Sequence, residues 1–204
     1  MKKHFIMLLI LFIFCSCAAG PVYVAKNESE STKSMYLDGK SQELFNRNAD
    51  LFRDIYSRYN SSRINFYNEG LGVTTLKDEK NKALYYLMVY IRPPEISFDE
   101  NTTKPEERFS YALLEVPRYL KLIKSKDLER DGIEGLAFGI YWPVRDFSQC
   151  QKNGGFIEYL YIYLKKDDAQ DILDGRKDYK ATLVYSEVIT SLGLKPAQSV
   201  RPVF

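Results

Sequence analysis

The segment Phe156–Leu164 constrains the fold most, because its side chains alternate between two sets. In an extended chain, Ile157, Tyr159, Tyr161 and Tyr163 lie on one face. The other face carries Phe156, Glu158, Leu160, Ile162 and Leu164. This period of two predicts a strand in a sheet that separates two different environments.

Two predicted hairpins account for most of the expected sheet. The side chains of 133–142 also alternate between two sets, which predicts a second strand that Pro143 is expected to end. Together with 156–164, this strand predicts a hairpin with a long loop. Upstream, the apolar, β-favouring runs 71–76 and 83–91 flank a polar segment and predict an antiparallel hairpin.

Helical patterns surround these strands. The apolar stripe from Leu44 to Tyr59 predicts one helix capped by Ser41. The stretch 106–126 begins with acidic residues and ends with lysines, an order that suits the helix dipole. It predicts a second helix, kinked or split by Pro117. The stretch 167–173 predicts a short helix. Residues 179–192 fit a helix by spacing and a strand by composition; the Gly193 and Pro196 that follow favour the helix.

The order of these elements predicts one α+β domain over 41–204. We expect a small, mostly antiparallel sheet built from two hairpins, with helices packed on one face. The chain of 204 residues is 45% hydrophobic, which supplies enough apolar side chains for one core.

The N-terminus predicts an export signal. Lys2 and Lys3 precede an apolar run over 5–14, which is about half the length needed to cross a bilayer as a helix. The segment Phe14-Cys15-Ser16-Cys17-Ala18 then resembles the lipobox of bacterial lipoprotein precursors. Cys17 is the matching cysteine rather than Cys15, because the small Ser16 precedes it.

The resemblance implies where in the cell the protein is located. Residues 1–16 would be removed as a signal peptide, Cys17 would carry the lipid, and residues 17–40 would form a lipidated, flexible tether. Ala18 after the cysteine resembles the sorting pattern of the outer membrane. We therefore expect a bacterial cell-envelope protein held by its lipid anchor, with the domain facing the periplasm.

Signal removal also limits the chemistry of the chain. It takes away the only histidine, His4, and leaves equal numbers of acidic and basic residues. Without histidine, Ser-His-Asp catalysis and histidine-ligated zinc are excluded, and the neutral balance argues against a nucleic-acid partner. Cys150 would be the one free thiol, which excludes an internal disulfide and favours an inert cysteine.

Tyrosine is the one residue type in excess, with 16 in the chain. Tyr159, Tyr161 and Tyr163 share a strand face, and tyrosine suits contact surfaces for proteins or saccharides. The alternative is an ordinary sheet face packed under the tether or a terminal segment, because tyrosine also favours strands.

Acidic residues offer a catalytic alternative. Glu134 and Glu158 lie at or near predicted strands and could face each other as a glycosidase pair. The Asp residues at 167, 168, 171 and 174 lack the pattern of a calcium loop, so neither a metal nor a cofactor is expected. We therefore expect a membrane-tethered, non-catalytic binding or assembly factor. The alternative is an envelope hydrolase using acidic residues, with glycans as one substrate class.

Overall fold

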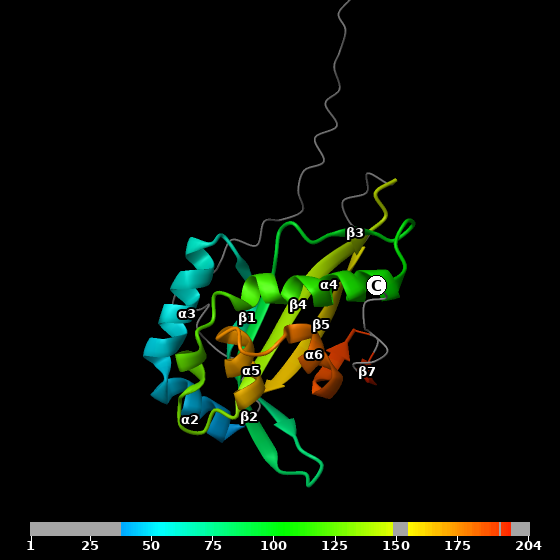
Figure 1. Cartoon of the computed structure of the whole chain (residues 1–204). Coiled ribbons are helices and arrows are strands. Elements are labelled where there is room, and N and C mark those ends of the chain that lie inside the picture. Colours follow the sequence, from blue (N-terminus) through cyan, green and yellow to red (C-terminus); the bar gives the residue numbers. More distant parts are fainter. Residues whose placement is uncertain (1–37, 149–154, 192, 197–204) are drawn as a thin grey trace, which may run out of the picture.

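A computed structural model of the protein describes residues 38–148, 155–191 and 193–196 (Figure 1). The predicted signal peptide, Cys17, the tether up to residue 37 and Cys150 lie outside the described residues. The described part combines helices with one sheet and has the α+β class predicted from the sequence.

In the described residues the sheet has seven strands, and six of them follow the order β1-β2-β4-β5-β6-β7 while β3 pairs with β4. The strands are β1 (Asn65–Lys77), β2 (Ala83–Arg92), β3 (Phe98–Asp99), β4 (Gly135–Arg145), β5 (Gly155–Lys165), β6 (Glu187–Thr190) and β7 (Gly193–Pro196).

The two predicted hairpins are present, but the predicted sheet built mostly from them is wrong. Strands β1 and β2 pair antiparallel, as do β4 and β5. Between them, β2 and β4 run parallel, with Val89 opposite Phe138. The helix α4 (Pro105–Leu120) lies between these two strands in the chain, and a crossover of this kind lets neighbouring strands point the same way. The sheet is therefore mixed.

Pro143 does not end its strand as predicted. Strand β4 continues to Arg145, and Pro143 is paired with Ile157 of β5. On the other side of β4, β2 pairs only as far as Ile140 and β3 only from Val144. Pro143 therefore lies between two pairing partners, where a missing N–H is tolerated.

The first predicted helix is two helices, α2 (Gly39–Arg47) and α3 (Ala49–Ser61). Asp38, not Ser41, caps the first, because its carboxylate accepts the Ser41 N–H at 2.7 Å. Asn48 separates the two helices, and its side-chain amide donates to the Leu44 carbonyl at 2.8 Å. Asparagine often ends helices by competing for backbone groups in this way.

The helix α4 continues through Pro117 to Leu120, and the 3-10 helix η1 (Ser125–Leu128) follows it. A proline has no N–H to donate to the carbonyl four residues earlier, here that of Leu113. The Tyr179 hydroxyl donates to this carbonyl instead, at 3.1 Å. A side chain from another element thus satisfies the acceptor that Pro117 leaves open.

The favoured helix over 179–192 is wrong for much of its length. Residues Tyr179–Thr182 form α6 and Leu183–Tyr185 form the 3-10 helix η2, but Glu187–Thr190 form strand β6. Val188 pairs with Ile162 of β5, so the β-branched residues add a strand to the sheet. The predicted short helix is present as α5 (Lys166–Leu173) and ends before Gly175, which has φ of 72°.

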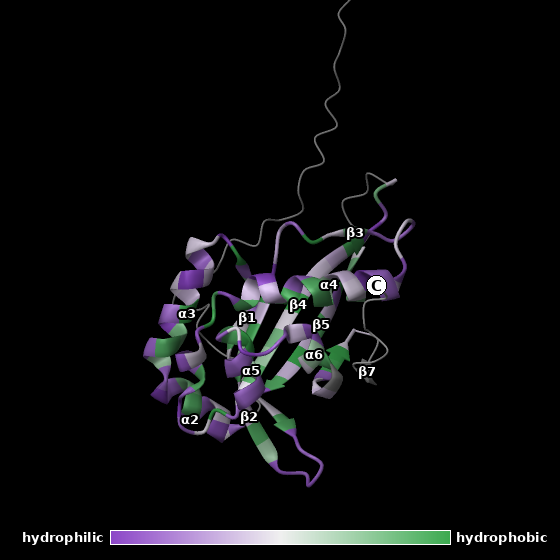
Figure 2. Ribbon diagram, in the orientation of Figure 1, coloured by the Kyte–Doolittle hydropathy of each residue, from purple (hydrophilic) through white to green (hydrophobic). Residues whose placement is uncertain are grey.

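The helices pack on one face of the sheet. Figure 1 shows α4, α5 and α6 in front of the strands, with α2 and α3 along the β1 side. The main core joins buried helix residues such as Phe52 and Phe109 to strand residues such as Phe138. Figure 2 shows hydrophobic residues on the strands and hydrophilic ones at the turn between β1 and β2. Among the described residues, every helix is too short or too polar to cross a bilayer.

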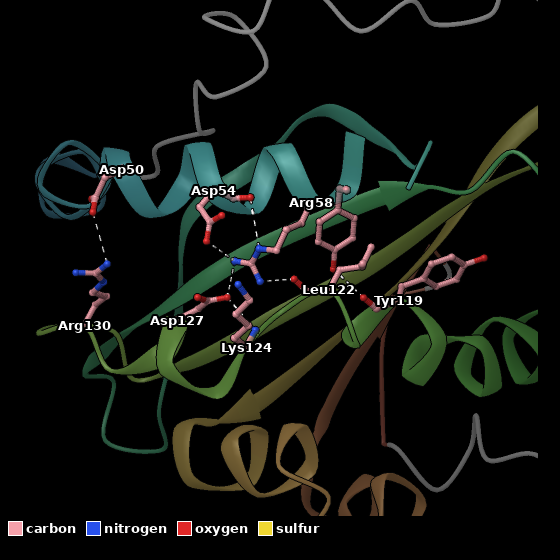
Figure 3. A network of polar contacts seen from close by, with 9 residues as sticks. Asp50, Asp54, Arg58, Tyr119, Leu122, Lys124, Asp127 and Arg130 are labelled. Carbon is pink, nitrogen blue, oxygen red and sulfur yellow. Dashed lines mark hydrogen bonds and ion pairs between the residues drawn. The ribbon is translucent and has the colours of Figure 1, made fainter. Parts of the chain in front are cut away.

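A polar network joins the end of α3 to the end of α4 (Figure 3). The Arg58 guanidinium donates to the buried Asp127 carboxylate at 2.7 Å and also to the Leu122 carbonyl. The neighbouring Tyr59 hydroxyl donates to the Tyr119 carbonyl at 3.0 Å. These bonds use carbonyls at and just beyond the C-terminal end of α4, and they hold α3 against α4.

Candidate functional site

The sheet face opposite the helices carries a second, smaller cluster of side chains. We call it the tyrosine face. All of its described members come from strands. Its aromatic members are Tyr67, Tyr86, Tyr90, Tyr141, Tyr159, Tyr161 and Tyr163. Strand alternation separates these residues from the main core, as the sequence predicted for Tyr159, Tyr161 and Tyr163.

A glycine on β4 makes room for the centre of this cluster. Gly139 lies in register between Tyr90 of β2 and Tyr161 of β5. The two tyrosine rings stack over it, with centroids 4.4 Å apart and planes within 6° of each other. A Cβ atom on Gly139 would approach Tyr161 to 2.6 Å and Tyr90 to 2.7 Å. The stack of Tyr90 on Tyr161 therefore requires glycine at position 139.

Further ring contacts extend the stack toward one end of the sheet. Tyr159 stacks on Tyr161 at 4.7 Å, and Tyr67 stacks on Tyr141 at 3.7 Å. Tyr90 and Tyr141 are only 4% and 5% exposed, whereas Tyr67, Tyr159 and Tyr161 are half-buried. Tyr67 and Tyr161 therefore each stack on a buried ring, and Tyr159 stacks on Tyr161, so all three rings are held in place while they stay partly in contact with solvent.

The phenol hydroxyls also interact with one another. Those of Tyr90 and Tyr163 lie 3.4 Å apart, and those of Tyr141 and Tyr161 form a hydrogen bond. Burial raises the pKa of Tyr90 and Tyr141, and it raises the pKa of Tyr161 to about 12. These hydroxyls stay protonated at neutral pH, so they serve as hydrogen-bonding groups and not as catalytic bases.

Two arginines lie at the end of the tyrosine face, and the sequence analysis did not identify them. Arg92 follows Tyr90 by two residues on β2, so strand alternation places both on the same face. Arg145 lies four residues beyond Tyr141 on β4, and its side chain packs beside Gly155 of β5. Extending the alternation beyond the apolar residues would have identified both.

Neither guanidinium has a partner among the described residues. Arg92 and Arg145 are half-buried, yet neither makes an ion pair, a side-chain hydrogen bond or a cation–π contact there. The carboxylates near Arg145 in the chain or the sheet are engaged elsewhere. Asp99 accepts from the Asn101 N–H at 3.0 Å, and Asp146 accepts from the Ser148 hydroxyl at 2.6 Å. This end of the face therefore carries two half-buried guanidinium groups that make no ion pair with a described residue.

Glu158 lies on the opposite face, in the main core. It is 3% exposed and makes a bidentate ion pair with Arg108 of α4, with contacts of 2.7 and 2.8 Å. The Trp142 indole N–H donates to the same carboxylate at 3.0 Å. Burial lowers the pKa of Arg108, but the bonds to Glu158 outweigh it, so the pKa of Arg108 is raised. The carboxylate is thus held as a structural anion with no open side for a substrate.

Glu134 is far from Glu158. It precedes β4, accepts the Tyr85 N–H at 3.0 Å and lies 3.5 Å from Lys82. Glu158 pairs with Trp142, eight residues further along β4, which corresponds to roughly 26 Å of strand. Glycosidase carboxylates lie within about 10 Å of each other. The structure therefore does not bring the two glutamates together as a catalytic pair.

Three of the acidic residues at α5, Asp168, Asp171 and Asp174, form ion pairs with the turn that follows. Arg176 contacts Asp171 and Asp174 at 2.8 and 2.7 Å, and Lys177 contacts Asp168. Within the residues that the structure describes, no cluster of acidic, cysteine or histidine side chains has the arrangement of a metal site. Asp168, Asp171 and Asp174 thus have a structural role in these ion pairs.

No protein-family model matches the chain, and neither the curated proteins nor the solved structures gave a significant match.

Proposed function

We propose that the protein is a lipid-anchored, non-catalytic binding factor of the bacterial cell envelope. Its partner binds the tyrosine face. The lipobox-like segment around Cys17 supports the anchor, and the histidine-free, charge-neutral mature chain supports binding over catalysis.

The arrangement of rings on the tyrosine face carries this proposal. Helices pack on the other face of the sheet, while Tyr67, Tyr159 and Tyr161 remain half-buried. Each is fixed by stacking on a neighbouring ring. Rings that are already ordered lose little conformational entropy when a partner binds, so a rigid aromatic surface favours recognition.

The tether sets where the partner is found. The proposed tether spans the 20 residues between Cys17 and Asp38, where the described domain begins. A random-coil linker of this length has a root-mean-square reach of roughly 25 Å. The proposed domain therefore works close to its own membrane, and its partner is a component of that membrane or of the adjacent envelope layer.

Two measurements in the native host test this proposal. Intact mass and membrane fractionation of the full chain are compared with those of a Cys17→Ala variant. We expect a lipid-modified mass and membrane attachment that the variant loses. A soluble, unmodified product from both chains would overturn the proposed anchor.

Photo-crosslinking tests the binding surface. A benzoylphenylalanine replaces Tyr159 on the tyrosine face, and in a control chain it replaces Tyr111, which is 46% exposed on α4. We expect an adduct with an envelope component from position 159 and none from position 111. Equal adducts from both positions, or none from either, would remove the tyrosine face as the binding surface.

A further inference from the structure

The two arginines of the tyrosine face carry a specific inference about its ligand. Moving a guanidinium out of water has an energetic cost that proteins usually offset with a carboxylate or phosphate partner. Arg108 and Arg58 follow this rule, since both bind buried carboxylates. Half-buried Arg92 and Arg145 have no such partner among the described residues. An anionic ligand from outside the domain would give both guanidinium groups the partner that they lack.

Aromatic and cationic groups share this end of the sheet. In the parallel pairing of β2 and β4, Ile91 lies opposite Ile140, so the next residues, Arg92 and Tyr141, lie level with each other. Tyr141 is also the ring on which Tyr67 stacks. Arg145 lies four residues further along β4, or roughly 13 Å. Tyr159 pairs with Tyr141 from the other neighbouring strand. A ligand that lies along β4 therefore meets ring faces, hydroxyls and the Arg92 guanidinium at the level of Tyr141, and the Arg145 guanidinium beyond them.

We propose that this end of the tyrosine face binds an acidic saccharide chain, with sugar rings against Tyr67 and Tyr159 and carboxylates on Arg92 and Arg145. This inference rests on the proposed function and names its ligand class. Tyrosine rings suit the C–H faces of sugars, and phenol hydroxyls suit their hydroxyl groups. Arginine binds carboxylates through its planar fork of N–H donors, which accounts for the acidic character of the ligand.

Binding of defined polymers tests this inference. The full chain is purified from host membranes in a non-ionic detergent and titrated with polygalacturonate, with neutral dextran and with dioctanoyl-phosphatidylglycerol. We expect binding to polygalacturonate and at least about tenfold weaker binding to dextran, because dextran offers no carboxylate to the guanidinium groups.

Matched variants assign the binding to this site. We expect Arg92→Gln with Arg145→Gln to weaken polygalacturonate binding by about tenfold or more, and Tyr159→Leu to weaken it as well. The control pair, Arg47→Gln with Arg53→Gln, removes the same charge from exposed positions on α2 and α3. It should bind as the unchanged chain does, and thermal unfolding verifies that all variants fold.

Other outcomes overturn the inference in distinguishable ways. If the control pair weakens polygalacturonate binding as much as the Arg92 and Arg145 pair does, the binding is general electrostatic attraction. If dextran binds as tightly as polygalacturonate, the arginines have no role in recognition. Binding of the phospholipid alone would assign the arginines to headgroup phosphate. If no polymer binds but position 159 still crosslinks to an envelope protein, the saccharide is wrong and the proposed function survives. If neither occurs, both fail.

Discussion

The hydroxyl of Tyr179 donates a hydrogen bond to the carbonyl oxygen of Leu113 at 3.1 Å, and this is the carbonyl that Pro117 leaves without an N–H donor. Both tyrosine and carbonyl are buried, so water does not replace the bond. One side chain thereby lets α4 continue through its proline and fixes the start of α6 against that helix.

Replacing Tyr179 with phenylalanine should destabilise the protein by about 1–3 kcal/mol, because it leaves a buried carbonyl unsatisfied. Urea unfolding measures the change. Adding Pro117→Ala restores the backbone donor, so the cost of Tyr179→Phe should fall in that background. The control Tyr111→Phe alters an exposed hydroxyl and should change stability by less than about 0.5 kcal/mol. Equal costs of Tyr179→Phe in both backgrounds would contradict this explanation of the proline.

The buried ion pair predicts a larger effect. Glu158→Gln should destabilise the protein by about 3–5 kcal/mol, because it leaves the Arg108 charge buried without its partner. Trp142 is the only tryptophan of the chain and donates to this carboxylate, so its fluorescence follows the unfolding and the change at the site. The exposed Glu129→Gln serves as the control. A stability loss no larger than that of the control would show that the pair contributes nothing.

Local patterns predicted the strand faces well. The alternation over 156–164 separated the Tyr159 face from the Glu158 face, and both hairpins were predicted from apolar runs and the polar segments between them. Such signals depend on neighbours within a few residues. The parallel pairing of β2 and β4 was missed because it joins segments about 50 residues apart, and their apolar patterns are the same in either direction.

The candidate site shows the same limit. Periodicity placed Tyr159, Tyr161 and Tyr163 together, but it could not show which of them would be buried by rings from β1, β2 and β4. Glu158 looked available because its partner Arg108 is 50 positions away on α4. Arg92 and Arg145 were overlooked because each ends a strand whose hydrophobic pattern had already stopped. Whether a charged side chain has an ion-pair partner can be seen only in the three-dimensional structure.

The ring stack predicts that Gly139 tolerates no side chain. Gly139→Ala should destabilise the protein by about 1–3 kcal/mol, since its Cβ would lie 2.6 and 2.7 Å from two ring atoms and the stack must shift. Near-ultraviolet circular dichroism should show the altered environment of the tyrosines. Gly39→Ala is the matched control, because a Cβ there meets nothing within 4 Å. Unchanged stability and spectrum in Gly139→Ala would disprove the tight packing.

The buried phenols also predict how stability depends on alkaline pH. Burial raises the pKa of Tyr86 and of Tyr161 to about 12, whereas an unfolded tyrosine titrates near pH 10. A raised folded pKa means that the native state holds the phenol proton more tightly than the unfolded state. The resulting stability is complete below about pH 10 and is lost as the pH rises toward 12.

Urea unfolding at a series of pH values from 8 to 12 should therefore show a midpoint that falls above about pH 10. Tyrosinate absorbance of the native protein should rise at higher pH than that of the protein in denaturant. Tyr161→Phe removes one of the shifted phenols and should flatten the fall in stability, whereas Tyr111→Phe at its exposed position should leave the slope closer to that of the unchanged chain. If native and denatured protein titrate together, these phenols are not buried and the proposed rigidity of the tyrosine face is lost with them.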